Sequence, residues 1–335
     1  MRVPKYLSPS SFKLFESSLD EFYVKYLAEN RPPRMGQTKP MSVGSAFDAY
    51  AKSYIHYCLF GNYGKNEQYA KDTIFEQQVE AHNRDWARQA GQHAFNCYKD
   101  CGALADLMLE LNSSVGKPRF EFEIQGTVES RIGSVPLLGK PDIFFMNAQG
   151  ARVILDWKVN GYCSNSMISP MPGYVLVRDA WKPGARKASS GDRMPHRDCF
   201  PTRFKGMMIN TIAKLEDLNS EWAAQLSIYS WLLGEEVGSQ DLIIGVDQLC
   251  GCGSAGPEGP HLKVASHRLR ASANYQHELL DRLTNAWNII ESGHIFRELS
   301  REGSDARCAD LERQCAAMSD PNDPMASFIS ECARG

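Results

Sequence analysis

The clearest hydrophobic pattern in the chain is a pair of short apolar runs near its middle. The first run, Ile143-Phe144-Phe145, begins directly after Asp142, and the second, Val153-Ile154-Leu155, is followed by Asp156. Residues 146–150, which separate the runs, carry turn chemistry. Runs of this length that are rich in Ile, Val, Leu and Phe predict two adjacent strands joined as a hairpin.

Helical and strand-like patterns surround this hairpin. Apolar residues recur every three or four positions in stretches that predict helices over residues 8–27, 41–51, 66–112, 221–233 and 275–295. Alternating or continuous apolar runs predict further strands over residues 119–124, 242–249 and 262–266. Helices interspersed with strands in this way predict an α/β fold, in which a central mixed sheet is flanked by helices.

Ionisable residues stand at the ends of the two central strands. Asp156 and Lys158 are two positions apart, so they point to the same face of a strand, and the hairpin brings Asp142 beside them. Carboxylates held close together repel each other, and a divalent cation such as Mg²⁺ relieves that repulsion. The pattern therefore indicates metal-assisted phosphodiester hydrolysis, with a surface aspartate and a surface ion pair as the alternative.

A second pair of polar residues lies on the helix predicted over residues 221–233. Gln225 and Tyr229 are four positions apart and share one face of that helix. The amide can orient a metal-bound water or a phosphate, and the phenol can hydrogen-bond a phosphate or a catalytic carboxylate. The alternative is a core helix whose apolar side faces inward. Both interpretations hold together if that side packs on the sheet.

These two motifs, in this order, resemble the PD-(D/E)XK nuclease superfamily. Pro141-Asp142, thirteen intervening residues and Asp156-Trp157-Lys158 match the defining pattern, and the later Gln-x-x-x-Tyr helix is similar to that of the RecB-type exonuclease branch. The resemblance covers the chain to about residue 55, residues 119–160 and residues 221–233. It implies a restriction-endonuclease-like core and a single-domain phage or bacterial DNA exonuclease that depends on Mg²⁺ or Mn²⁺.

The resemblance also implies a role for each site residue. Asp142 and Asp156 would hold the metal, with the backbone carbonyl of Trp157 as a further ligand. Lys158 would orient or activate the attacking water and stabilise the transition state. The Gln225 amide and the Tyr229 phenol would position the substrate.

The chain departs from the family pattern at two places. Asp48 stands where a Gly-x-x-x-His helix carries its histidine, and as an oxygen ligand it still suits Mg²⁺ or Mn²⁺. The alternative is an exposed aspartate paired with Lys52. Some relatives bind an iron–sulfur cluster with an N-terminal Cys-Pro and three late cysteines. Ser18-Leu19 replaces the Cys-Pro here, and the late cysteines are widely spaced, which argues against a cluster.

We expect residues 1–299 to form one nuclease domain, followed by a loosely held tail over 300–335. Its parts are a helical region over 1–118, the catalytic sheet over 119–160, an inserted arm over 161–219 and the motif helix with the remaining elements over 220–299. The basic residues of the arm that we expect to contact DNA are Arg178, Lys182, Arg186 and Lys187. The alternative for this arm is a solvated loop.

The composition of the chain limits the partners and the cellular location that we expect for the protein. The net charge of −3 means that any DNA contact depends on a local basic surface. No long apolar segment is present, so we predict no signal peptide and no contact with a membrane. The ten cysteines are scattered, which indicates a reduced, cytoplasmic protein. Cys250 and Cys252, with His261 and His267 nearby, offer a zinc alternative, but a glycine-rich turn explains their spacing better.

Two further classes of function stay open at this point. Asp48 in place of histidine favours a catalytically degenerate nuclease fold that serves as a DNA-binding or assembly module. The zinc alternative favours an interaction protein. Family habits alone suggest recombination, repair or phage DNA processing, with a recombination or replication protein as a partner. The sequence leaves open the polarity of digestion, the preference for single or double strands and the oligomeric state.

Overall fold

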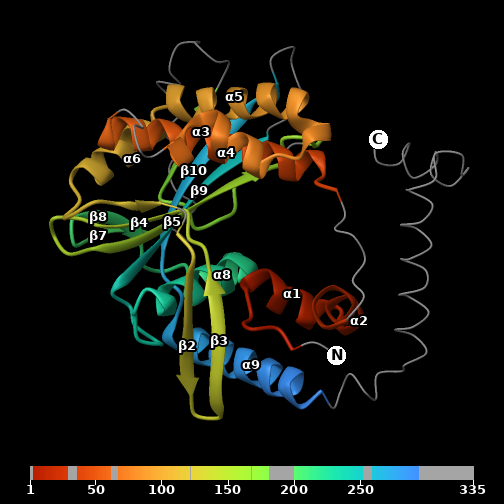
Figure 1. Cartoon of the computed structure of the whole chain (residues 1–335). Coiled ribbons are helices and arrows are strands. Elements are labelled where there is room, and N and C mark those ends of the chain that lie inside the picture. The colour runs from red at the N-terminus through yellow and green to blue at the C-terminus, as the bar shows by residue number, and fades with distance from the viewer. Residues whose placement is uncertain are drawn as a thin grey trace, which may run out of the picture.

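The protein is built around a six-stranded mixed sheet with helices on both faces (Figure 1). The computed structural model describes residues 3–28, 36–61, 67–120, 122–166, 168–180, 200–251 and 259–293. The sheet has the order β1-β4-β5-β9-β10-β6. Its strands are β1 Arg119–Phe120, β4 Ile143–Met146, β5 Arg152–Asn160, β9 Leu242–Gly251, β10 Leu262–Leu269 and β6 Leu176–Ala180. The predicted α/β fold with a mixed central sheet and flanking helices is confirmed.

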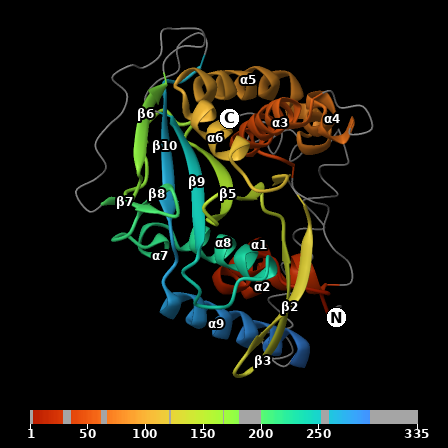
Figure 2. The same cartoon turned by 90° about the vertical axis from the view of Figure 1, so that its left-hand side faces the viewer.

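Two small antiparallel ribbons lie outside the six-stranded sheet. The first pairs β2 Ile124–Ser130 with β3 Gly133–Gly139, and the second pairs β7 Pro201–Phe204 with β8 Met207–Asn210. Figure 2 shows the β2–β3 ribbon leaving the main sheet and running past α8 toward α9.

The helices form two layers. The layer above the sheet in Figure 1 contains α3 Lys39–Phe60, α4 Lys71–Gln78, α5 Arg84–Asp100 and α6 Ala103–Asn112. The layer on the other side contains α1 Pro9–Ser17, α2 Leu19–Phe22 with the π-helical turn Tyr23–Leu27, α8 Ser220–Leu232 and α9 Ala273–Ser292. Shorter pieces are α7 Leu215–Leu218 and the 3₁₀ turns Glu67–Tyr69 and Ala81–Asn83.

Strand β5 shows how the sheet separates the two layers. Leu155 and Trp157 pack into the core shared with α3, α5 and α6, whereas Ile154 packs into the core shared with α8 and α9. Since side chains alternate along a strand, Asp156 and Lys158 fall on the same side as Ile154. The parallel pairing of β5 with β9 needs a long crossover connection, and α8 belongs to that connection.

Several sequence predictions of element boundaries were wrong. The single helix predicted over 66–112 is three helices, because the chain is extended at Val79 and Gly102 takes a left-handed conformation with φ of 89°. The helix predicted over 8–27 is interrupted at Ser18, which is extended and whose side chain caps α2 by accepting the Glu21 N–H. The strand predicted over 119–124 is divided between β1 and the start of β2.

The stretch predicted as an inserted arm, 161–219, is partly built into the sheet. Its β6 strand pairs antiparallel with β10 at the sheet edge, and β7 and β8 form a hairpin. Residues 181–199 of this stretch, and the tail predicted over 300–335, lie outside the described residues. None of the helices in the described ranges has the length and apolar character that a membrane crossing requires.

Close packing of α3 against α5 supports a stability prediction. A Cβ atom on Gly91 would lie 2.5 Å from the Cβ of Ala46, whereas one on Gly44 would meet nothing within 4 Å. Gly91→Val is expected to lower the free energy of unfolding by about 1–3 kcal/mol through overpacking. Gly44→Ala is the matched control and is expected to raise it by about 0.5–1 kcal/mol through helix propensity. Urea unfolding of both variants checks the pair, and equal stability of Gly91→Val and the parent chain would contradict the packing described.

Candidate active site

The hairpin of β4 and β5 brings Asp142 and Asp156 together. In the antiparallel register Ile143 lies opposite Leu155, so Asp142, which precedes β4, lies beside the end of β5. Its Oδ2 accepts a hydrogen bond from the backbone N–H of Trp157, with an N–O distance of 3.1 Å. The two carboxylates predicted as metal ligands are therefore neighbours.

Lys158 and Gln225 close a small polar network around Asp156. Lys158 Nζ lies 2.6 Å from Asp156 Oδ2 and donates to Gln225 Oε1 at 2.9 Å. Gln225 Nε2 lies 3.3 Å from Asp156 Oδ1 and donates to the hydroxyl oxygen of Tyr229 at 3.1 Å. Helix α8 thus contacts strand β5 through Gln225, and Tyr229 in turn contacts Gln225.

Gly139 allows this contact at the end of β3. A Cβ atom there would lie 2.6 Å from Tyr229 Cδ1 and 2.9 Å from Leu232 Cδ1, distances that side-chain atoms do not tolerate. The ribbon can approach α8 this closely only because the residue is glycine. Burial raises the pKa of the Tyr229 phenol, which therefore stays protonated at neutral pH.

Helix α3 adds a second cation to the site. Lys52 Nζ lies 3.0 Å from Asp48 Oδ2 and 2.9 Å from Asp142 Oδ1, and its side chain is only 2% exposed. The structure thus brings Asp48 to the site through Lys52. From the sequence we considered Lys52 only as the partner of Asp48 in an ion pair on the helix face. The feature that could have indicated burial of Lys52 is its position among small and apolar residues of α3, such as Ala51 and Ile55.

The charges of this cluster are strongly coupled. Burial raises the pKa of Asp48 to about 7, with Lys52 opposing the shift, and burial raises the pKa of Asp156 to about 6 against the opposing effect of Lys158. Burial also acts on Asp142, but Lys52 and the Trp157 N–H outweigh it and hold the pKa of Asp142 below its usual value. Burial opposes charge on Lys158 as well, yet Asp156 overcomes it and raises the pKa of Lys158.

The donor set fits a magnesium or manganese ion with few protein ligands. In the described ranges no three or more Asp, Glu, His or Cys side chains are grouped as a metal cage. Mg²⁺ commonly takes only one or two carboxylates and completes its shell with water and substrate phosphate. Asp142 and Asp156 supply two such carboxylates. Burial and, to a smaller extent, repulsion by Asp142 raise the pKa of Asp156, and a cation between the two carboxylates would relieve that repulsion.

Trp157 anchors the strand that carries the site. Its ring is buried on the opposite face of the sheet, 6.0 Å from the Phe47 ring centroid. Its Nε1 donates to the hydroxyl of Tyr98, which in turn donates to Asp247 at 2.6 Å. These contacts fix the backbone between Asp156 and Lys158 from the face of the sheet that α3 and α5 cover.

Arg178, one of the predicted DNA contacts of the arm, is not part of this cluster. Arg178 lies on β6, which two strands, β9 and β10, separate from β5, and its guanidinium pairs with Asp106 at 2.5 Å. The lysines and arginine predicted to contact DNA from the same arm, Lys182, Arg186 and Lys187, lie outside the described residues. Their role remains a prediction.

The positions of Cys250 and His267 on their strands do not favour the zinc alternative. Cys250 lies opposite Lys263 in the β9–β10 pair, and His267 is four residues farther along β10, roughly 13 Å away at the rise of a strand. His267 Nε2 instead contacts Gln248 Oε1 at 3.0 Å. Cys252 lies outside the described residues.

Comparisons with known proteins leave the family open. No family model matches the chain, and no curated protein matches it. Among solved structures, one described as "Crystal structure of SSO0001" is 12% identical and covers 81% of this chain and 84% of its own, with a TM-score of 0.25. A TM-score of this size supports no conclusion about fold or function.

Proposed function

We propose that the protein is a Mg²⁺- or Mn²⁺-dependent deoxyribonuclease with a PD-(D/E)XK core of the RecB type, acting as an exonuclease. The observation that carries the proposal is the contact network of Asp142, Asp156, Lys158 and Gln225, drawn from two distant parts of the chain. A structural ion pair needs neither a second, partly buried carboxylate nor an amide that touches both members of the Asp156–Lys158 pair.

Each residue has a defined task in the proposed hydrolysis. A bound Mg²⁺ or Mn²⁺ supplies a Lewis acid and lowers the pKa of a coordinated water. Asp142 and Asp156 provide the negative charge that holds the ion. The Lys158 ammonium, oriented by Gln225, donates a hydrogen bond to the attacking water or to the phosphoryl oxygen, where negative charge develops. Tyr229 holds Gln225 in place.

The reaction class follows from this arrangement. Water adds to phosphorus and loses a proton, the bond from phosphorus to the leaving sugar oxygen breaks, and that oxygen takes up a proton. Family habits place such a nuclease in recombination, repair or phage DNA processing, beside a recombination or replication protein, within the cytoplasm. These contexts belong to the proposal.

The mode of action is tested with end-labelled linear DNA and circular DNA, each single- or double-stranded, in Mg²⁺, Mn²⁺ or EDTA. We expect the full chain to release label from linear DNA in the presence of metal and to leave circles intact. Cutting of circles would show an endonuclease and overturn the exonuclease assignment. Absence of hydrolysis on all substrates would overturn the proposal that the protein is an enzyme.

One observation favours a second candidate, a nuclease fold that binds DNA without cutting it. Lys52 is buried between Asp48 and Asp142, so one ammonium is already paired with two of the three carboxylates. A family histidine is also replaced by Asp48. The same digestion experiment separates the candidates, because this one predicts retained DNA binding without release of label.

The raised pKa values predict a pH dependence of stability. The native state binds protons on Asp48 and Asp156 more tightly than the unfolded chain does, since their pKa values are raised to about 7 and about 6. Their contribution is therefore largest at acidic pH and is lost as the pH rises through these values. Between about pH 5 and pH 8 in EDTA, the free energy of unfolding is expected to fall on the order of 2 kcal/mol more than in Asp48→Asn. Urea unfolding at a series of pH values measures this difference, and parallel curves for the two proteins would contradict it.

A further inference from the structure

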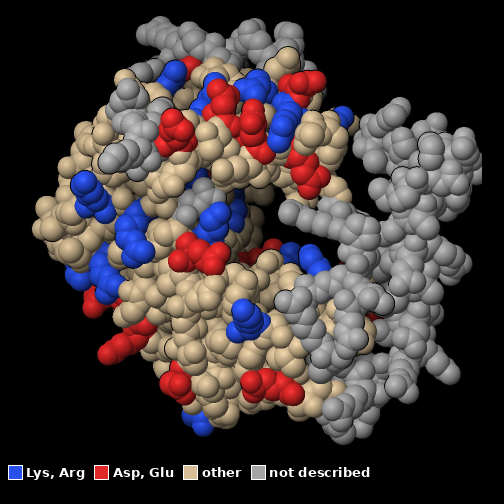
Figure 3. All heavy atoms as spheres, in the orientation of Figure 1, with Lys and Arg blue, Asp and Glu red and all other residues tan. Residues whose placement is uncertain are grey.

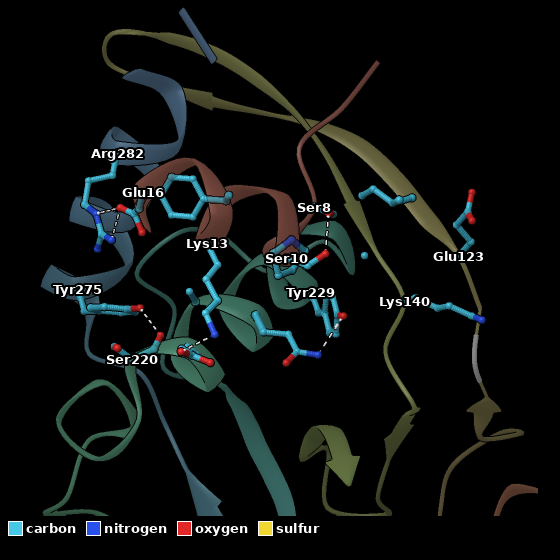
Figure 4. Close-up of a pocket in the computed structure, with 17 residues that line it drawn as sticks. Ser8, Ser10, Lys13, Glu16, Glu123, Lys140, Ser220, Tyr229, Tyr275 and Arg282 are labelled. Carbon is cyan, nitrogen blue, oxygen red and sulfur yellow. Dashed lines mark hydrogen bonds and ion pairs between the residues drawn. The ribbon is translucent and has the colours of Figure 1, made fainter. Parts of the chain in front are cut away.

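A pocket of about 530 Å³ opens next to the proposed catalytic network. Its walls come from α1, α8, α9 and the end of β3, and Gln225 and Tyr229 belong both to its lining and to the network. Figure 4 shows Tyr275 and Arg282 on one side of the pocket, Lys140 on the opposite side and Tyr229 between them. A ligand in this pocket would thus contact Gln225, whose amide contacts both Lys158 and Asp156.

The size of the pocket restricts its occupant. Sites of roughly 300–1,000 Å³ enclose ligands on the scale of one small molecule. A single nucleotide has that scale, whereas a base pair with both of its sugar–phosphate strands is much larger. Duplex DNA could place a nucleotide here only if that nucleotide left its partner, as in enzymes that act on unpaired bases.

The charges of the lining indicate a ligand with one phosphate. Its three cationic side chains, Lys13, Lys140 and Arg282, are balanced by Glu16, Glu123 and Glu221. Such a lining does not favour a backbone with many phosphates, because binding of that kind depends on an excess of Lys and Arg. Figure 3 likewise shows side chains of both signs around the hollow between the helical layer of α3 and α4 and the part that contains α1.

The ion pairs of the lining can exchange partners. Lys13 Nζ lies 2.7 Å from Glu221 Oε1, and the two side chains are 61% and 60% exposed. Arg282 Nε donates to Glu16 Oε1 at 2.8 Å in a pair that is also well exposed. Pairs of this kind contribute little to stability, so a phosphate can replace the carboxylate at small cost. The released carboxylates can accept hydrogen bonds from the N–H groups of a base.

Tyr275 supplies a partly buried aromatic ring at the same side of the pocket. Its hydroxyl donates to the backbone carbonyl of Ser220 at 3.1 Å, which fixes the position of the ring. Aromatic rings bind unpaired bases by stacking, with little dependence on sequence. One nucleotide could be recognised by these features together: the fixed ring stacks on its base, the exchangeable cations bind its phosphate, and the lining carries no excess charge.

From these features we propose that the pocket binds one unpaired nucleotide next to the scissile phosphate, which makes single-stranded DNA, or a frayed end, the substrate of this protein. The position next to the scissile phosphate rests on the proposed nuclease function. The binding of an unpaired nucleotide rests on the pocket itself.

The experiment compares two fluorescein-labelled probes that bind to the full chain in EDTA. One is a short oligothymidylate, and the other is a fully paired hairpin of equal nucleotide number with a blunt end. We expect the dissociation constant of the oligothymidylate to be at least about tenfold lower than that of the hairpin. Tyr275→Leu is expected to raise the oligothymidylate constant by about 5- to 50-fold, consistent with loss of one stacked base.

Three further variants separate recognition from folding. Tyr275→Phe keeps the ring and is expected to bind within about twofold of the parent chain, since stacking needs only the ring. Lys140→Gln, at an exposed position, is expected to weaken oligothymidylate binding about threefold and to reduce its salt dependence. Lys99→Gln removes an exposed lysine from α5 in the opposite layer and is expected to change nothing.

The outcomes separate this inference from the proposed nuclease activity. Equal affinity for the two probes, or parent-like binding by both Tyr275→Leu and Lys140→Gln, would overturn the pocket assignment, even if metal-dependent hydrolysis were observed. The expected binding pattern without hydrolysis in Mg²⁺ or Mn²⁺ would support the pocket and overturn the nuclease. Absence of binding to both probes would overturn the pocket assignment, and absence of hydrolysis in Mg²⁺ or Mn²⁺ as well would overturn both proposals.

Discussion

Lys158→Ala is expected to lower the rate of metal-dependent DNA hydrolysis by about 10²–10³-fold, the loss typical of one group aimed at charge that develops in a transition state. Lys158 touches both Asp156 and Gln225, so its removal also takes away one of the contacts that position the amide. The measurement is single-turnover release of label from linear DNA at saturating Mg²⁺ or Mn²⁺.

Two control variants distinguish a specific role of Lys158 from a general effect of removing a positive charge. Lys158→Arg keeps the charge with a different geometry and is expected to retain only part of the rate, because a planar guanidinium cannot reproduce the contacts of an ammonium. Lys99→Ala removes a distant exposed lysine and is expected to be neutral. A Lys158→Ala rate within about twofold of the parent, in a protein with unchanged circular dichroism, would remove Lys158 from the catalytic machinery.

Lys52→Met is expected to produce the largest loss of stability in the site. The ammonium is buried between the Asp48 and Asp142 carboxylates, and removing one partner of a buried ion pair typically costs about 3–5 kcal/mol. In EDTA the free energy of unfolding should fall by about that amount. Added Mn²⁺ should restore part of it, because a cation bound by Asp142 replaces the lost charge.

Asp48→Asn in the Lys52→Met background is the matched test. It removes one of the two carboxylates that would be left without a cation, so the double variant is expected to be more stable than Lys52→Met alone. Urea unfolding of the four proteins of this cycle isolates the coupling between Lys52 and Asp48. A loss below about 1 kcal/mol in Lys52→Met would show that Lys52 does not compensate the buried carboxylates.

The hairpin of the site could be predicted from the sequence because its determinants are local. Two apolar runs, a turn rich in Asn and Gly and a period of two place Asp142 beside Asp156, and the observed register agrees. The contact between Lys158 and Gln225 joins residues 67 positions apart. Periodicity carries no information about such a pair, and only the resemblance to a nuclease family pointed to it.

Other features of the site could not be predicted because they depend on tertiary contacts. Lys52 has the spacing of an exposed helical ion pair, and only the packing of α3 beside the sheet turns it into a buried bridge. Arg178 belongs to a stretch without a clear strand pattern, yet its segment pairs with β10 at the edge of the sheet. Burial and non-local pairing decide both cases, and a single sequence displays neither directly.

Asp142, Asp156 and Lys158 are proposed to form a metal-dependent phosphodiesterase centre. The most direct test of this proposal is label release from linear single-stranded DNA by the full chain and by Asp156→Asn, in Mn²⁺ and in EDTA. We predict release by the parent chain in Mn²⁺ only, and almost none by Asp156→Asn, because its neutral amide binds the ion weakly. Release that persists in EDTA, or equal release by Asp156→Asn, would contradict the proposal.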